Sequence, residues 1–303
     1  MHGWLILDKP LGLGSTQAVS AVKRALRAGG HPKLKVGHGG TLDPLASGVL
    51  PVAIGEATKL AGRLLDSDKT YQFTVRFGEE TATLDAEGAV TATSDARPAA
   101  AELEAVLSRF TGPITQTPPV YSALKVGGKR AYDLARAGEE VALASRDVVV
   151  HALALSSPPP ADGAVGEATL LAHVSKGTYI RSLARDIAYA CGTVGHVTTL
   201  RRVKAGPFDL SQSITLDKLD ELGHARQLEH HLLPLRAGLD DIPALPLTPD
   251  QAGALRQGRV LAGIAADAVR DGGQAFAMLG DTPVALVEVR DRQVRVVRGF
   301  NLE

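Results

Sequence analysis

Strand-like and helix-like segments interleave along this chain without the regular rhythm of βαβ units. Residues 71–77 alternate apolar and polar side chains, which is the pattern of a half-buried strand. Ser15 is the expected N-cap of a helix that ends at Gly29 and Gly30. The same reasoning predicts strands at 147–155 and 167–174 and helices at 99–110 and 179–189. This order favours an α+β or mixed-sheet architecture over a doubly wound parallel sheet.

The chain is expected to form two domains, because its 303 residues exceed the roughly 100–200 residues typical of one domain. Its character changes near residue 240, where DDIPALPLTP places three prolines in ten residues. Beyond this segment, residues 284–290 and 293–300 predict a β-hairpin that turns at Asp291 and Arg292. We therefore expect a large domain at 1–240 and a small β-rich domain at 241–303.

Cysteine usage and hydropathy point to a soluble cytoplasmic protein. The single cysteine, Cys191, cannot form an intramolecular disulfide. The opening MHGWLILDKP lacks both the basic start and the sustained apolar stretch of a signal peptide. No apolar run approaches the roughly 18 residues that would suggest a membrane span, so no membrane partner is expected.

The charge distribution permits a nucleic-acid partner although the formal net charge is zero. Residues 1–70 carry nine Lys or Arg against five acids, and residues 171–210 carry six against two. Such segregation is compatible with a basic face that neutralises phosphates. From charge alone, an ordinary solvated surface remains the alternative.

No cofactor or metal is predicted. The glycine clusters lack the third glycine of a dinucleotide fingerprint and the Gly-Lys-Ser/Thr end of a phosphate loop. Nine histidines without an HExxH pattern, together with one cysteine, give no metal-ligand spacing.

Three polar residues lie at positions where catalytic side chains are often found, in a glycine-rich loop or at the start of a predicted strand or helix. Asp43 lies in residues 36–48, VGHGGTLDPLASG, which are predicted to be a loop because they hold four glycines and a proline. Tyr71 opens a predicted strand, and Arg181 lies in SKGTYIRS. Taken singly, each has an ordinary structural reading, as a turn former, a core aromatic and a solvated helix residue.

The sequence resembles the TruB-type tRNA pseudouridine-55 synthases in four blocks: GHGGTLDPLASGVLPVAIGEATKL, PPVYSALKVGGKRAYDLAR, VSKGTYIRSLARDIA and LRRVKAGPF. With the opening LDKPLG they follow the family's order and span most of residues 5–210. The resemblance implies a pseudouridine synthase fold with a central mixed, largely antiparallel sheet flanked by helices and loops. More loosely, the C-terminal segment resembles a PUA-like RNA-binding domain.

The resemblance also implies roles for individual residues. Asp43 would be the catalytic carboxylate, with Arg181 paired to it and Tyr71 lying against the target base. Tyr179 and Leu200 would line the pocket that receives this base.

RNA contacts are expected from other positions. By resemblance, His38 helps to hold the RNA after bases are turned out. Lys9, Lys33 and Lys35 are candidate phosphate contacts because of their charge. The family usually has Thr or Ser where this chain has Gly39 and Gly14, so hydroxyl contacts to RNA are missing at those positions.

The implied reaction suits these residue types. Breaking the N1–C1′ bond builds positive charge at C1′, which a carboxylate stabilises, and a neighbouring arginine keeps that carboxylate ionised. Turning the base out costs a few kcal/mol, and stacking on Tyr71 returns about 1–3 kcal/mol. Nothing is oxidised, so no cofactor is needed. Whether Asp43 attacks C1′, attacks C6 or removes a sugar proton stays open.

The expected partner is the T-arm stem-loop of tRNA, without a guide RNA, and the protein is expected to be a monomer. One alternative is a non-catalytic RNA-binding protein or RNA chaperone on the same fold. An RNA-guided relative and a glycosidase are two others, although the sequence offers a glycosidase no clear second carboxylate beside Asp43.

Overall fold

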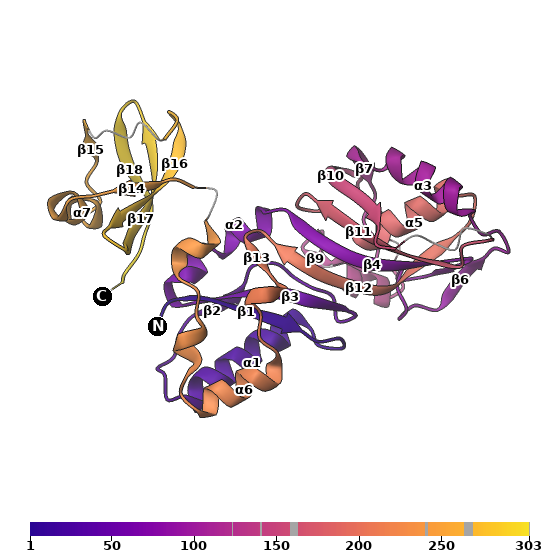
Figure 1. Cartoon of the computed structure of the whole chain (residues 1–303), viewed down its shortest axis with the longest axis horizontal. Coiled ribbons are helices and arrows are strands. Elements are labelled where there is room, and N and C mark those ends of the chain that lie inside the picture. Colours follow the sequence, from indigo (N-terminus) through magenta and orange to yellow (C-terminus); the bar gives the residue numbers. More distant parts are fainter. Residues whose placement is uncertain (123, 140, 158–162, 240–241, 264–268, 303) are drawn as a thin grey trace.

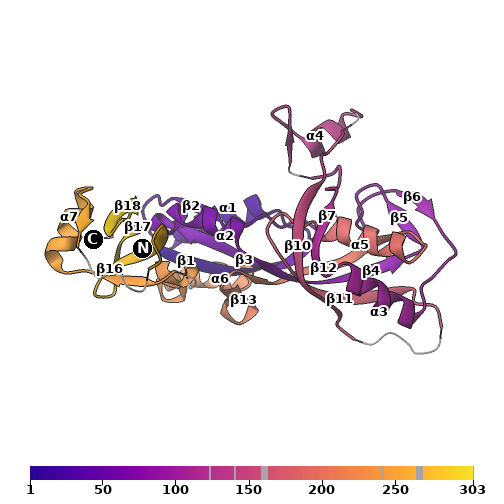
Figure 2. The ribbon, with the colours of Figure 1, turned by 90° about the horizontal axis from the view of Figure 1, so that it is seen from above.

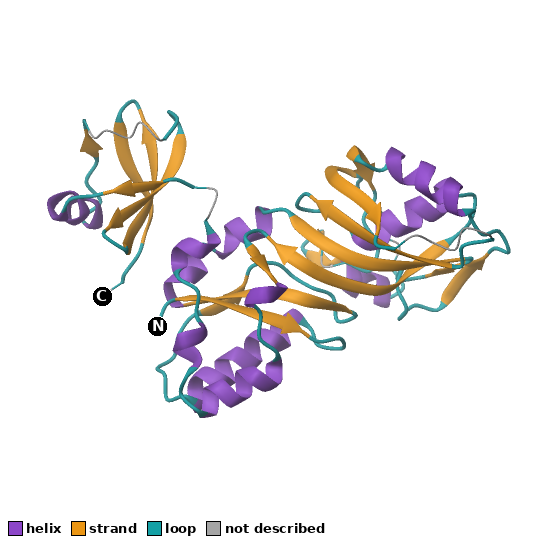
Figure 3. Cartoon of the chain, in the orientation of Figure 1, coloured by secondary structure: helices purple, strands orange, loops and turns teal. Residues whose placement is uncertain are grey.

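The computed structural model describes residues 1–122, 124–139, 141–157, 163–239, 242–263 and 269–302. Two main β-sheets organise these residues, a large one between Gly3 and Asp209 and a small one near the C-terminus (Figures 1 and 3). Both chain termini lie at the end of the molecule that carries the small sheet. Among the helices described, none is long and apolar enough to cross a membrane.

The large sheet has nine strands among the described residues, in the order β1-β3-β12-β4-β11-β10-β7, with β2 paired to β3 and β13 to β12. They are β1 (Gly3–Lys9), β2 (Val36–His38), β3 (Ala46–Ile54), β4 (Lys69–Phe77), β7 (Gly112–Gln116), β10 (Arg146–Leu155), β11 (Glu167–Val174), β12 (Gly195–Ala205) and β13 (Phe208–Asp209). Only the β12–β3 pair among these is parallel. The predicted α+β fold with a mixed, largely antiparallel sheet is confirmed.

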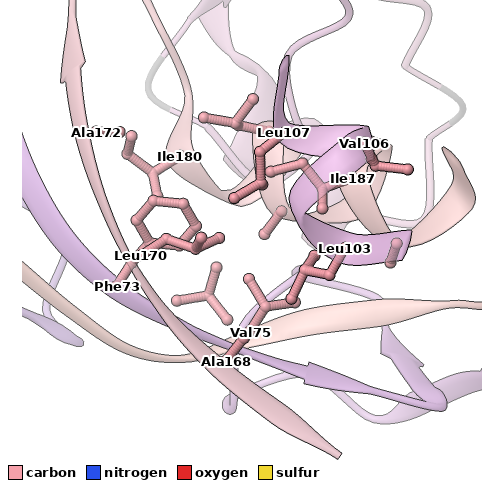
Figure 4. Close-up of a cluster of buried hydrophobic side chains, with 14 of the residues drawn as sticks. Phe73, Val75, Leu103, Val106, Leu107, Ala168, Leu170, Ala172, Ile180 and Ile187 are labelled. Carbon is pink, nitrogen blue, oxygen red and sulfur yellow. The ribbon is translucent and has the colours of Figure 1, made fainter. Parts of the chain in front are cut away.

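Two of the buried cores pack helices against this sheet. In one half, α1 (Ser15–Ala28) and α6 (Leu216–His224) pack on β1 and β3. In the other, α3 (Ala100–Arg109) and α5 (Ile180–Ala190) pack on β4 and β11. Figure 4 shows Phe73 and Val75 of β4 directed toward Leu103 of α3 and Ile187 of α5. Tyr71 and Leu200 contact both cores, so the boundary between the two halves runs past these residues.

Shorter helices, strands and 3₁₀ turns lie in the connections between these elements and after the last of them. They are β5 (Glu79–Thr81), β6 (Val90–Thr93), β8 (Lys125–Val126), β9 (Lys129–Arg130), α2 (Ala61–Asp66), α4 (Ala131–Arg136) and the 3₁₀ turns η1 (Gly55–Lys59), η2 (Leu210–Gln212), η3 (Leu228–His231) and η4 (Leu235–Gly238). The α4 segment, which follows the β8–β9 hairpin, projects from one side of the sheet (Figure 2).

The small sheet has five strands among the described residues, in the order β14-β16-β17-β18-β15. They are β14 (Ala244–Pro246), β15 (Leu261–Ala262), β16 (Gly273–Leu279), β17 (Thr282–Arg290) and β18 (Gln293–Gly299), accompanied by α7 (Pro249–Arg256). Asp291 and Arg292 both have positive φ, 51° and 56°, which suits the tight turn of a hairpin. The predicted hairpin is confirmed, whereas the predicted boundary between residues 240 and 241 lies outside the described residues.

The two sheets share an apolar junction. Phe276, Met278 and Phe300 belong to the same buried cluster as Trp4 and Phe208. The small sheet therefore covers one end of the large unit rather than standing free of it.

Two details differ from the sequence-based expectations. Residues 36–48 are not all loop, because β2 and the start of β3 occupy both ends, where pairing between strands satisfies their backbone. Ser15 is the first helical residue rather than the N-cap. That position belongs to Gly14, whose N–H donates to Oε1 of Gln17 at 2.8 Å.

Candidate active site

A cavity of about 320 Å³ lies where the two halves of the large sheet meet, which is within the usual range for small-molecule sites. Five of the seven predicted site residues line it: Asp43, Tyr71, Tyr179, Arg181 and Leu200. They come from a loop, two strands and the start of one helix. His38 and Lys9 lie outside the cavity.

The loop that carries Asp43 is tied to the helix before it. Ser15, which is buried, donates its hydroxyl to the Leu42 carbonyl at 2.9 Å and accepts from the Leu42 N–H at 2.8 Å. On the other side of Asp43, the Pro44 carbonyl accepts from the N–H of Gly12 at 2.8 Å. The backbone on both sides of Asp43 is therefore fixed, while its side chain stays 44% exposed toward the cavity.

Arg181 holds the carboxylate of Asp43. Its Nη2 lies 2.9 Å from Asp43 Oδ2, and its Nη1 lies 3.2 Å from Asp85 Oδ2. The guanidinium also donates to the carbonyls of Thr83 and Tyr121, at 2.8 and 3.0 Å. It is only 7% exposed, and a buried guanidinium is stable only when its donors have such partners.

Asp85 was missed in the sequence, where nothing links it to a residue 96 positions away. Its Oδ1 accepts from the Thr83 hydroxyl and from the Glu87 N–H, so the side chain is fixed before it meets Arg181. Leu84, next to it, has a positive φ of 60°, an uncommon conformation for a residue other than glycine. Asp85 does not line the cavity that contains Tyr71.

Two more buried cations donate hydrogen bonds to backbone carbonyls in and around this loop. Arg202 donates to the carbonyls of Val49 and Gly40, at 2.7 and 3.1 Å, and is 1% exposed. The Lys9 ammonium donates to the carbonyls of Pro10 and Leu13, at 2.9 and 2.6 Å. Through the carbonyl of Gly40, and through that of Pro44 at 3.5 Å, the two cations hold the backbone on both sides of Asp43.

Lys9 was expected to contact an RNA phosphate. The structure places its side chain at 0% exposure, and burial lowers the pKa of the Lys9 amine to about 8. This position suits support of the Asp43 loop rather than contact with a ligand.

Tyr71 and Leu200 reach the cavity from neighbouring strands. In the register of β4 and β12, Arg202 lies opposite Tyr71 and Leu200 lies opposite Phe73. The same β4 strand pairs with β11 on its other side, where Ala172 faces Tyr71. Strands on both sides therefore fix the backbone of Tyr71.

Tyr179 lies just before α5 and is clamped by a buried amide. Gln116 accepts from the Tyr179 N–H at 2.7 Å and donates to its carbonyl at 3.1 Å. Burial raises the pKa of the Tyr179 phenol, while the guanidinium of Arg146, 5.5 Å from the ring centre, opposes that change. The phenol therefore stays protonated and can donate a hydrogen bond near neutral pH.

His38 ends β2, outside the cavity, and its Nδ1 accepts from the Gly40 N–H at 3.4 Å. Burial, followed by the nearby Arg202 charge, lowers the pKa of the His38 imidazole. The neighbouring Gly39 is packed against Leu64, because an added Cβ would lie 2.8 Å from the Leu64 Cβ. Packing here accounts for a glycine at position 39.

The described residues contain no group of three His, Cys, Asp or Glu side chains arranged to hold a metal ion. The cavity offers one paired carboxylate, two phenols, the cationic side chains of Lys69, Arg181 and Arg202, and apolar walls. This arrangement can bind a flat ring and place a carboxylate beside it.

Comparison with known proteins gives a consistent picture. Residues 23–180 match the N-terminal domain of the TruB family pseudouridylate synthases, and residues 181–240 match the tRNA pseudouridylate synthase B C-terminal domain. The chain is 64% identical to tRNA pseudouridine synthase B of Novosphingobium aromaticivorans, covering 100% of this chain and 98% of that one. It is 61% identical to the protein of the same name from Zymomonas mobilis, covering 99% and 96%.

Among solved structures, the chain resembles a component of an H/ACA RNP bound to a substrate RNA containing 2′-deoxyuridine. The TM-score is 0.73 at 24% identity, covering 99% of this chain and 85% of that one. This likeness supports the same fold for the two chains.

Proposed function

The chain belongs to the TruB family of pseudouridylate synthases, and we propose that it isomerises uridine 55 in the T-arm of tRNA to pseudouridine, with Asp43 as the catalytic carboxylate. The observation that carries this proposal is the Asp43–Arg181 pair, 2.9 Å apart, at the wall of a cavity lined by Tyr71, Tyr179 and Leu200. A carboxylate at this wall complements the positive charge that develops at C1′.

The target uridine leaves its stack and enters the cavity, as enzymes that act on a base require. Its ring lies against Tyr71, and Leu200 supplies an apolar surface. The N1–C1′ bond breaks, the freed uracil turns, and a C5–C1′ bond forms. N1 gains a proton and C5 loses one, so atoms and charge balance without a redox step. The phenolic oxygen of Tyr71 is a candidate acceptor for the C5 proton.

The remaining groups bind and orient. The protonated phenol of Tyr179 donates to an oxygen of the uracil, and Gln116 fixes the backbone that carries this phenol. Arg181 sets the direction of the Asp43 carboxylate. His38 helps to hold the RNA once bases have been turned out.

We propose residues 1–240 as the catalytic domain and 241–303 as a PUA-like domain that contacts RNA. β18 supports the second assignment, because it exposes Arg295 and Arg298. The protein would act as a cytoplasmic monomer and select its uridine without a guide RNA, through the local shape of the T-arm.

A glycosidase is less well supported, because it requires two carboxylates that flank one bond across a shared cavity. Asp85 lines a smaller pocket of about 140 Å³ together with Asp43, but it is 11% exposed and paired with Arg181, and it does not line the cavity that contains Tyr71.

The experiment that tests the proposal is incubation of the protein with an unmodified tRNA transcript and with an isolated T-arm stem-loop, followed by nucleoside mass spectrometry. We expect pseudouridine at one position in both RNAs, and none with Asp43→Asn. RNA binding without conversion by the wild-type protein would support a non-catalytic RNA-binding protein instead.

A further inference from the structure

A second hollow, the basic groove, lies at the C-terminal end of α1. Its volume is about 660 Å³, and its basic side chains are those of Lys23, Arg27, His31, Lys33 and Lys35. Leu26, Leu34 and Val36 supply an apolar floor. None of the described residues that line the groove is acidic.

The cations of the groove are available to a ligand. Lys23, Arg27, Lys33 and Lys35 are all exposed. None of these four takes part in an ion pair within 4.0 Å in the described part of the chain. The sequence between Lys9 and Leu42 holds no acid at all. Like charges gathered without counter-charges repel one another, and a polyanion relieves that repulsion.

The groove is distinct from the active-site cavity, with which it shares no lining residue. Along the chain, only His38 and Gly39 separate Gly37 of the groove from Gly40 of the cavity. Because three residue steps span at most about 11 Å, the linings of the two hollows come within that distance of each other. A ligand long enough could occupy both.

On its other side the groove adjoins the small sheet. Thr58 lines the groove, and the next residue, Lys59, donates to the Gly299 carbonyl at the end of β18 at 2.9 Å. In Figure 2 the α1–β2 region lies between the small sheet and the α4 segment. Through Lys59, the groove is thus linked to the end of β18, the strand that exposes Arg295 and Arg298.

We propose that the basic groove binds the phosphate backbone of the tRNA outside the arm whose uridine enters the cavity. This inference rests on the proposed function, because it takes tRNA as the ligand. An RNA that reaches the groove and the small sheet as well as the cavity extends beyond the arm that delivers the base. Lysines and arginines around the groove neutralise phosphates, and the apolar floor accommodates sugar faces.

The test compares Lys33→Glu and Lys35→Glu with Arg24→Glu. Arg24 is exposed on α1 beside Lys23 but does not line the groove, so its reversal changes the net charge equally. For each protein, affinity is measured as a function of salt for a full tRNA transcript and for the isolated T-arm stem-loop, together with the single-turnover rate. Circular dichroism checks the fold of each variant.

We expect each groove variant to bind full tRNA about fivefold more weakly or worse, and the slope of log affinity against log salt to become shallower by about 0.7–0.9, as for one lost phosphate contact. Stem-loop affinity and the rate at saturating RNA should stay at wild-type values, and Arg24→Glu should change tRNA affinity much less. Equal weakening for both RNAs, or no weakening for either, overturns the groove assignment. A wild-type protein that fails to convert the stem-loop overturns the proposed function itself.

Discussion

Asp85 Oδ2 lies 3.2 Å from Nη1 of Arg181, so the guanidinium that pairs with Asp43 is held from behind by a second carboxylate. The side chain of Asp85 is 11% exposed, against 44% for Asp43. The buried carboxylate therefore anchors the arginine, and the exposed one remains free to meet a substrate. Because Arg181 keeps a partner when Asp43 is changed, an Asp43 variant tests chemistry rather than folding.

Asp85→Asn should slow conversion by roughly tenfold to a hundredfold, as when a partner that orients a reactive group is lost. The amide keeps the size of the side chain but removes the charge that faces Arg181. RNA affinity should stay near the wild-type value. Single-turnover kinetics and RNA titration measure the two quantities, with the exposed Asp95→Asn as control. A wild-type rate in Asp85→Asn would deny this residue a positioning role.

Two substitutions separate two roles of Tyr71. Tyr71→Phe keeps the ring, so base capture should survive, while the chemical rate falls by roughly 10²–10⁴ if the hydroxyl takes a proton. Tyr71→Leu removes the aromatic face as well and should weaken capture by about 1–3 kcal/mol. Both are read by single-turnover kinetics at several RNA concentrations. A fully active Phe variant would limit Tyr71 to stacking, and a fully active Leu variant would leave it only a structural role.

Ser15→Ala should both destabilise the protein and slow the reaction. The hydroxyl makes two hydrogen bonds to Leu42, next to Asp43, and their loss leaves buried backbone groups without partners at a cost of about 1–3 kcal/mol. Ser20→Ala on the same helix is the matched control, because the Ser20 hydroxyl bonds only to the Thr16 carbonyl at an exposed position. Urea denaturation and single-turnover rates compare the two. If Ser15→Ala and Ser20→Ala had the same stability and the same rate, the loop would hold its shape without the Ser15 hydroxyl.

Local patterns in the sequence predicted the helices and strands well, but they predicted contacts between distant segments poorly. The alternation at 71–77 is enough to predict β4, because one face of that strand is buried and the other is not. The positions of Asp85 and Arg202 depend instead on which strands become neighbours, and no local period encodes that. Lys9 shows the same limit, since a lysine is exposed by default and only the folded loop gives its ammonium carbonyl partners.

Lys9 should also leave a signature in the pH dependence of stability. Burial lowers the pKa of its amine from 10.5 to about 8 in the folded protein. Between these two values the unfolded chain binds more protons than the folded one, so the free energy of unfolding rises with pH in this window. Lys9→Met removes that contribution. The free energy of unfolding of the wild-type protein minus that of Lys9→Met should therefore increase between about pH 8 and about pH 10.5, by on the order of 3 kcal/mol.

Urea denaturation of the wild-type protein and Lys9→Met at several pH values in this window measures the difference in their free energies of unfolding. The contributions of all other titrating groups are common to both proteins and cancel in this difference. Methionine also leaves the carbonyls of Pro10 and Leu13 without their donor, which adds an offset that does not depend on pH. The slope, and not this constant offset, reports the buried amine. Lys23→Met, at an exposed position of α1, shows what loss of a surface charge does alone. A Lys9 difference that stays flat across the window, or falls as pH rises, would mean that the carbonyl partners stabilise the ammonium at least as strongly as water does.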